Sequence, residues 1–182
     1  MRIIAGSARG RSFDAPRGRD TRPTLDRVKE AIFGSIQFQV PGATVLDLFS
    51  GSGNMGLEAL SRGAESCVFV DADRTAVKLT KLNLERTGLR GEVFQADALR
   101  FLESREKYDL IFIDPPYRSE LYGDVLQRIK DFDKLHAGGI MVVESSADYE
   151  PESPGAPYSK LRSYRYGKVR ITTFTRSEGS EP

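Results

Sequence analysis

The chain of 182 residues has one cysteine, Cys67, and one histidine, His136. A disulfide needs two cysteines, and structural zinc sites take their ligands mainly from cysteine and histidine. We therefore expect no disulfide, no metal site and no histidine-based catalytic triad. Cys67 lies in the apolar run CVFV and is expected to be a small buried hydrophobic residue, whereas His136 is expected at a helix end or in a loop.

Long apolar runs are also missing from the sequence. A helix that crosses a bilayer needs about 20 predominantly apolar residues. The start, MRIIAGSARG, lacks the long apolar segment of a secretory signal. The composition, 39% hydrophobic and 29% charged, is that of a globular protein with room for one α/β domain. We expect a cytoplasmic monomer that does not act at a membrane.

Acidic residues are scarce in the first 29 positions, although the net charge of the whole chain is only +1. A basic arm of this kind suits a polyanionic partner, but a solvated surface has a similar composition. The candidate phosphate contacts are Arg2, Arg9, Arg11, Arg17 and Arg19.

Apolar runs alternate with helical patterns from position 44 onward, which predicts a mostly parallel sheet with crossover helices. The expected strands are 44–49, 66–71, 91–95, 108–114 and 139–145, and the expected helices are 55–62, 74–86, 98–104 and 120–132. The segment 147–158 is expected to be a loop because it is rich in proline, glycine and acids. The runs 159–166 and 168–176, with Gly167 between them, predict an antiparallel hairpin that closes one edge of the sheet.

The N-terminal part predicts a small β-hairpin followed by a helix over 24–36, with Thr24 as its cap. The resulting division is a basic hairpin and helix at 1–40, an α/β domain at 41–176 and a frayed tail at 177–182.

A glycine-rich turn follows the first predicted strand in VLDLFSGSGNMGLEAL, where Gly51, Gly53 and Gly56 form GxGxxG. Glycines permit a sharp turn and close approach to a ligand, and a helix N-terminus offers free N–H groups. Asp71 ends the next strand, where its carboxylate can accept hydrogen bonds from ribose hydroxyls. A strand, a glycine turn, a helix and a following acid in register predict a site for a nucleoside-containing cofactor.

Asp47 argues against a dinucleotide as that cofactor. Its carboxylate would repel a pyrophosphate but suits a cationic amino group. The pattern D-x-F-x-G-x-G resembles class I S-adenosylmethionine-dependent methyltransferases, with a Rossmann-like sheet, and this resemblance implies that S-adenosylmethionine binds here and is converted to S-adenosylhomocysteine. The cofactor residues so implied are Asp47, Phe49, Ser50, Gly51, Gly53, Asp71, Ala72, Asp97, Ala98, Arg22 and Thr24. Asp97 would read the adenine amino group, and it could also cap a helix.

The fourth predicted strand ends in Asp114-Pro115-Pro116-Tyr117, at the sheet edge where ligands of open α/β folds bind. The lone pair of an exocyclic base nitrogen is delocalised into the ring. The Asp114 carboxylate and the Pro115 carbonyl could accept its two N–H bonds, while Tyr117 stacks on the base. Asp114 could also accept the proton that is lost.

The tetrad resembles the [DNS]-P-P-[YFW] motif of amino-group methyltransferases. Together with RIIAGSARGRSFDAP, TRPTLDRVKEAIF and KVRITTF, it makes nearly the whole chain similar to the bacterial 16S rRNA guanine-N2 methyltransferase family. The resemblance implies methylation of one guanine of small-subunit rRNA. The alternatives are an adenine-N6 DNA or protein-glutamine methyltransferase, a catalytically silent RNA-binding assembly factor and an NAD oxidoreductase.

Overall fold

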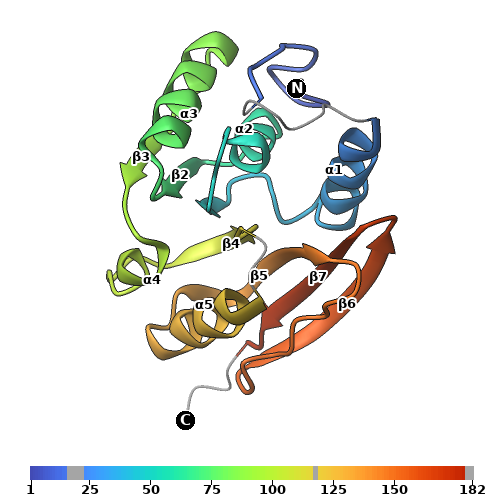
Figure 1. The fold of residues 1–182 in the computed structure, drawn as a ribbon, viewed down its shortest axis with the longest axis vertical. Coiled ribbons are helices and arrows are strands. Elements are labelled where there is room, and N and C mark those ends of the chain that lie inside the picture. Colours follow the sequence, from blue (N-terminus) through green and yellow to red (C-terminus); the bar gives the residue numbers. More distant parts are fainter. Residues whose placement is uncertain (16–22, 117–118, 179–182) are drawn as a thin grey trace.

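The computed structural model describes residues 1–15, 23–116 and 119–178 (Figure 1). Seven strands form one sheet in the order β3-β2-β1-β4-β5-β7-β6. Neighbours among β1 to β5 run parallel, and β7 runs antiparallel to both β5 and β6. The strands are β1 (Thr44–Leu48), β2 (Ser66–Asp71), β3 (Glu92–Gln95), β4 (Tyr108–Ile113), β5 (Leu135–Ser146), β6 (Tyr158–Tyr166) and β7 (Val169–Arg176). This arrangement confirms the expected mostly parallel sheet with a C-terminal hairpin.

Helices cover both faces of the sheet, as the buried parallel strands require. The helices are α1 (Pro23–Ser35), α2 (Asn54–Ser61), α3 (Arg74–Thr87), α4 (Ala98–Phe101) and α5 (Ser119–Asp131). In Figure 1, α1, α2 and α3 lie on one side of the sheet and α4 and α5 on the other. None of the helices within the described ranges is both long and apolar enough to cross a bilayer.

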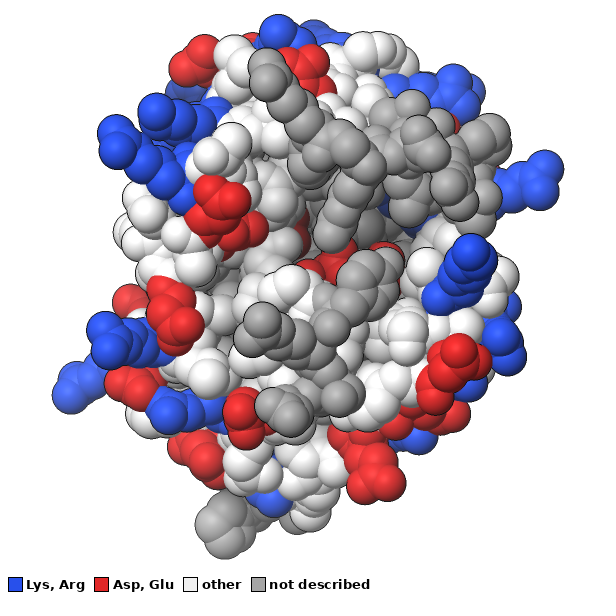
Figure 2. Space-filling view, in the orientation of Figure 1, with Lys and Arg blue, Asp and Glu red and all other residues white. Residues whose placement is uncertain are grey.

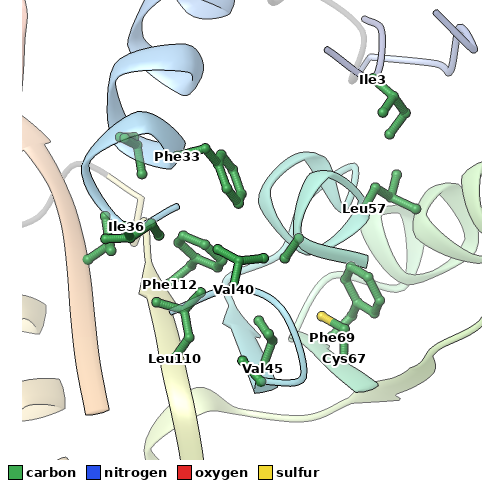
Figure 3. Close-up of a cluster of buried hydrophobic side chains, with 14 of the residues drawn as sticks. Ile3, Phe33, Ile36, Val40, Val45, Leu57, Cys67, Phe69, Leu110 and Phe112 are labelled. Carbon is green, nitrogen blue, oxygen red and sulfur yellow. The ribbon is translucent and has the colours of Figure 1, made fainter. Parts of the chain in front are cut away.

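The side chains between the sheet and α1, α2 and α3 form a buried cluster that includes residues of the N-terminal segment (Figure 3). Ile3 lies over the same cluster as Leu57 of α2, and the rings of Phe33 in α1 and Phe112 in β4 are 5.6 Å apart between centroids. Cys67 is buried in this cluster, as expected of a small hydrophobic residue. A second cluster fills the space between the sheet and α4 and α5.

Three local expectations were wrong. Helix α1 begins at Pro23, a favourable first helical residue, so Thr24 lies inside the helix rather than at its cap. Strand β5 begins at Leu135 rather than at residue 139, with a register shift where it pairs with β4. This irregular start was not predicted because the sequence Ala-Gly-Gly at 137–139 has low β-propensity. His136 consequently lies in a strand, where it is exposed.

The N-terminal segment forms the expected hairpin-like turn, with an antiparallel bridge between Arg2 and Ser12. A buried carboxylate, Glu58 of α2, holds this segment against the domain. Its oxygens accept hydrogen bonds from the backbone N–H groups of Ile4 (2.9 Å) and Ala5 (3.0 Å). Lys29 of α1 forms an ion pair with Glu58 at 3.1 Å, and both side chains are almost completely buried. Burial lowers the pKa of Lys29, and the Glu58 carboxylate opposes this shift.

We predict that Glu58→Gln lowers the free energy of unfolding by about 3–5 kcal/mol, because the buried Lys29 ammonium loses its counter-charge. Urea denaturation followed by circular dichroism measures this loss. Glu65→Gln, the same change at an exposed position, should stay within about 0.5 kcal/mol of the parent. Equal stability of the parent and Glu58→Gln would show that the pair does not hold the segment.

Candidate functional site

The predicted site residues gather at one edge of the sheet. Strands β1, β2 and β4 are parallel neighbours, so their carboxyl ends, and the loops that follow them, meet at this edge. The tip of β4 lies near the middle of Figure 1, and at the same place Figure 2 shows acidic side chains in a hollow.

The glycine turn after β1 has an unusual backbone. Phe49 has φ 63°, and a positive φ is uncommon and strained for a residue with a Cβ. Gly51 follows with φ 56°, and a Cβ added there would have its nearest neighbour 4.0 Å away, so the space beside it is open. Ser50 is buried, yet its Oγ has no hydrogen-bond partner within the described part of the chain. Open space and an unsatisfied hydroxyl fit a turn that receives a polar ligand.

Asp71 and helix α3 hold the turn in place. The two carboxylate oxygens of Asp71 accept the N–H groups of Gly51 and Asp73, each at 2.9 Å. A carboxylate has about four lone-pair sites, so Asp71 retains the capacity to accept ribose hydroxyls. From α3, Thr80 donates to the carbonyl of Gly51 at 3.1 Å and Asn83 donates to that of Ser52 at 2.9 Å.

Asp47 lies under the start of α2, with only 4% of its surface exposed. Its Oδ2 accepts the N–H of Gly56 at 2.9 Å. Glycine is required at position 56, because a Cβ there would come within 2.3 Å of the Phe69 ring. Burial is the main reason that the pKa of Asp47 is raised to about 8; the hydrogen bond from Gly56 opposes this rise, and the nearby carboxylates of Asp114 and Asp71 contribute to it. A cation placed beside these three acids would relieve their mutual repulsion.

The residues after β2 and β3 occupy the rim of this edge. Ala72 and Asp97 are exposed, and Ala98 is buried at the start of α4. Asp97 accepts the N–H of Arg100 at 3.0 Å, which confirms its role as a helix cap. One of its oxygens makes this bond, so the second can still accept a hydrogen bond from an amino group.

Asp114 and Pro115 follow β4 directly. Asp114 is half-buried, Pro115 is buried and Pro116 is exposed. The electrostatic influence of Asp114 on Asp47 shows that the two carboxylates lie near each other. Tyr117 lies outside the described residues. So do Arg22, Arg17, Arg19 and the side chain of Thr24, all of them predicted site residues.

The described arginines of the arm differ in their surroundings. Arg2 pairs with Asp26 at 3.0 Å, and Arg11 donates to the carbonyl of Thr87 at the end of α3. Arg2 and Arg11 stay predicted phosphate contacts, since both are exposed, and folding gives each of them a partner within the protein. Arg9 is exposed at the turn.

Thr80 and Asn83 were missed when the site was predicted from sequence. Both side chains are completely buried, three positions apart on the face of α3 that also carries Val77 and Leu84. Polar residues at the spacing of the apolar ones, with Thr87 as a third, were the available signal, because a buried polar group needs a partner. Their partners lie about thirty positions earlier in the chain, beyond the reach of a local pattern.

Comparison with known proteins places the whole chain beside methyltransferases. The sequence model of the family described as "Conserved hypothetical protein 95" matches residues 1–175. The "Putative rRNA methyltransferase YlbH" of Bacillus subtilis is 43% identical over 96% of this chain and 98% of its own length. The "Ribosomal RNA small subunit methyltransferase D" of Escherichia coli K12 is 32% identical over 100% of this chain and 92% of its own length.

The fold agrees with these matches. A solved structure described as "Putative methyltransferase yhhF from Escherichia coli" superposes with a TM-score of 0.87 and 30% identity, over 98% of this chain and 99% of that one. A putative methyltransferase complexed with SAH has a TM-score of 0.69 at 19% identity, which is a likeness of fold. The sheet is thus that of a class I methyltransferase, as the resemblance in the sequence predicted.

Replacing Asp47 by Asn should stabilise the ligand-free protein at pH 8 and do so less at pH 5. The folded-state pKa of Asp47, about 8, lies above the value of about 4 in the unfolded chain, so the folded protein loses stability as the pH rises through that window. The free energy of unfolding of Asp47→Asn, relative to that of the parent, should increase by at least about 1 kcal/mol between pH 5 and pH 8. Urea denaturation at both pH values measures it.

Asp124→Asn, on the exposed face of α5, is the matched control. Its free energy of unfolding should equal that of the parent at both pH values. A constant difference between Asp47→Asn and the parent would contradict the raised pKa.

Proposed function

Because the chain belongs to the family of small-subunit ribosomal RNA methyltransferases, we propose that it transfers a methyl group from S-adenosylmethionine to the exocyclic N2 of a guanine in 16S rRNA. The observation that carries this proposal is the juxtaposition at the sheet edge. Asp114 and Pro115, which can hold an amino group, follow the strand directly beside the glycine turn. An acceptor nitrogen and a cofactor methyl would therefore meet between β1 and β4.

The residues at the glycine turn fit S-adenosylmethionine. Asp47 would face its cationic amino group, Asp71 would accept its ribose hydroxyls, and the free oxygen of Asp97 would accept its adenine amino group. The open space at Gly51 and the unsatisfied Ser50 hydroxyl support close contact at the turn. When bound, this cofactor supplies a methyl carbon made electrophilic by its attachment to a positively charged sulfur.

The residues after β4 act on the acceptor. The Asp114 carboxylate and the Pro115 carbonyl accept the two N–H bonds of the amino group and turn its lone pair toward the methyl carbon. The nitrogen would take the methyl group that the cofactor supplies by cleavage of its C–S bond, and Asp114 would accept the proton that the nitrogen loses. Two prolines in succession restrict the backbone, so this pair of acceptors needs little reorganisation.

Relatives named for small-subunit rRNA favour RNA over DNA or a protein glutamine as the substrate. The intact Asp114-Pro115-Pro116-Tyr117 sequence favours an enzyme over a silent assembly factor. Incubation with tritiated S-adenosylmethionine and small subunits that lack endogenous modification, followed by nucleoside analysis, tests reaction and base together. N2-methylguanosine would support the proposal, and N6-methyladenosine or an absence of label would refute it.

The proposal also assigns the segment 1–40 to RNA binding and 41–176 to catalysis. The N-terminal segment shares the buried cluster of the domain, so the two parts form one packed body rather than a flexible tether. Arg9, which is exposed, would contact phosphate directly, together with Arg17 and Arg19. Arg2 and Arg11 would contact RNA only by leaving or sharing their present partners.

Exchanging Asp114 for Ala should lower the rate of methyl transfer at least about a hundredfold while cofactor affinity stays close to that of the parent. Asp71→Ala is the complementary variant and should weaken cofactor binding by about 1–3 kcal/mol, because it removes the acceptor of the ribose hydroxyls and of the Gly51 N–H. Single-turnover kinetics and calorimetry separate the two effects. Near-normal turnover by Asp114→Ala would assign the tetrad a structural role.

For the arm, we predict that Arg9→Ala flattens the slope of log affinity for the small subunit against log salt by about 0.7–0.9, the contribution of one phosphate contact. Affinity should fall most at low salt, and cofactor binding should be unchanged. Arg105→Ala, an exposed arginine between α4 and β4, serves as the control. If both variants give the parental slope, the RNA surface lies elsewhere.

A further inference from the structure

The register of the sheet places a second carboxylate beside Asp114. Leu48 of β1 is level with Val70 of β2 and with Ile113 of β4, and Ile113 is level with Val143 of β5. Extending this register by one residue places the next residue of each segment on one line across the sheet. That line, which we name the edge row, contains Asp71, Phe49, Asp114 and Glu144, and the pairing of β5 with β7 and of β7 with β6 extends it to Ile171 and Tyr164.

Alternation along β5 gives the face on which Glu144 lies. Ile140 and Val142 belong to the cluster beneath α1 and α2, whereas Met141 and Val143 belong to the cluster on the α5 side. Successive side chains of a strand point to opposite faces, so Glu144 continues the α1 and α2 face. Asp47, bonded to Gly56 of α2, lies on this same face of the sheet.

The position of Glu144 is a costly one for a charge. Strand β5 is interior, between β4 and β7, and the four residues before Glu144 are buried. Glu144 is half-buried, and Ile171 is its neighbour on β7. A carboxylate in such surroundings loses part of its hydration, so it gains from a hydrogen-bond donor placed beside it.

We propose that Glu144 recognises the target guanine by accepting its N1–H, while Asp114 and Pro115 hold the N2 amino group. This inference rests on the proposed guanine-N2 function. The N1–H and the N2 amino group are neighbouring donors on one edge of guanine. Adjacent strands are about 4.8 Å apart, so carboxylates from neighbouring strands can accept neighbouring donors of one base.

The same carboxylate excludes adenine. Adenine has an unprotonated N1, whose lone pair would face the negative charge of Glu144. A site built to accept a hydrogen bond discriminates strongly against an analogue that lacks the donor, because a buried acceptor is left unpaired. Glu144 would thus determine which base enters, and Asp114 would act on the amino group of that base.

The test compares guanine with 2-aminopurine, which keeps the amino group at position 2 but has an unprotonated N1. Small subunits are reconstituted with either base at the methylated position, after that position has been mapped. We expect the parent to prefer guanine by at least about a hundredfold in kcat/KM. Glu144→Gln, whose amide can donate to N1, should lose at least about tenfold in kcat/KM on guanine and gain at least about tenfold on 2-aminopurine, so that the preference falls at least about a hundredfold.

Binding gives a readout that does not depend on methyl transfer. Extrusion of 2-aminopurine from its stacked neighbours raises its fluorescence, and with S-adenosylhomocysteine present this signal reports capture of the base. Glu144→Gln should capture 2-aminopurine more tightly than the parent. Glu144→Asp keeps an acceptor and should retain the preference for guanine, and Glu92→Gln, the same change at an exposed position at the start of β3, should match the parent.

Equal losses on both bases, or an unchanged preference in Glu144→Gln, would overturn the assignment of Glu144 and leave the proposed function standing. Should the parent form no N2-methylguanosine on guanine-containing subunits, the proposed function and the role of Glu144 would both fall. Cofactor affinity equal to that of the parent verifies that each variant is folded.

Discussion

The buried carboxylate of Glu58, in α2, binds three separate parts of the chain. It accepts N–H groups of the N-terminal segment, pairs with Lys29 of α1 and binds Arg62 at the end of its own helix. Lys29 in turn donates to Asn54, the first residue of α2, at 3.0 Å. A buried charge without partners would be too costly to keep, so these segments are fixed relative to the helix that opens directly after the glycine turn.

The start of α2 lies beside the glycine turn, where we propose that the cofactor binds. Carboxylates rather than water satisfy the N–H groups of Gly51 and Gly56, through Asp71 and Asp47. The turn is consequently held in its binding shape before any ligand arrives, which reduces the free energy lost on ordering. The raised pKa of Asp47 means that its ionised form destabilises the ligand-free fold, because this acid is buried and lies near Asp114 and Asp71. A site that binds a cation gains from such a concentration of negative charge, at the expense of the ligand-free fold.

The proposed site for the acceptor base depends on the order of the strands in the sheet. Strands β4 and β5 lie on the other side of β1 from β2, so Asp71 and Glu144 lie on opposite sides of Asp114 in the edge row. Methyl transfer from a cofactor to a base needs both molecules at the same edge of the sheet. The parallel strands alone form such an edge, because their carboxyl ends lie together. The edge row ends at Tyr164, a half-exposed aromatic residue of the outermost strand.

The sequence by itself determined the sheet, the glycine turn, Asp71 and the tetrad that begins at Asp114, because each of these is local. Strand periodicity, positive-φ glycines and a proline pair depend on residues a few positions apart, and the whole-chain resemblance added the family. Only the tertiary structure decided that Glu58 pairs with Lys29, that Arg11 reaches Thr87, and that Ile113 and Val143, the residues before Asp114 and Glu144, are level. These relations join residues that are far apart in the chain. They arise from strand register and packing, and a pattern of neighbouring residues contains neither.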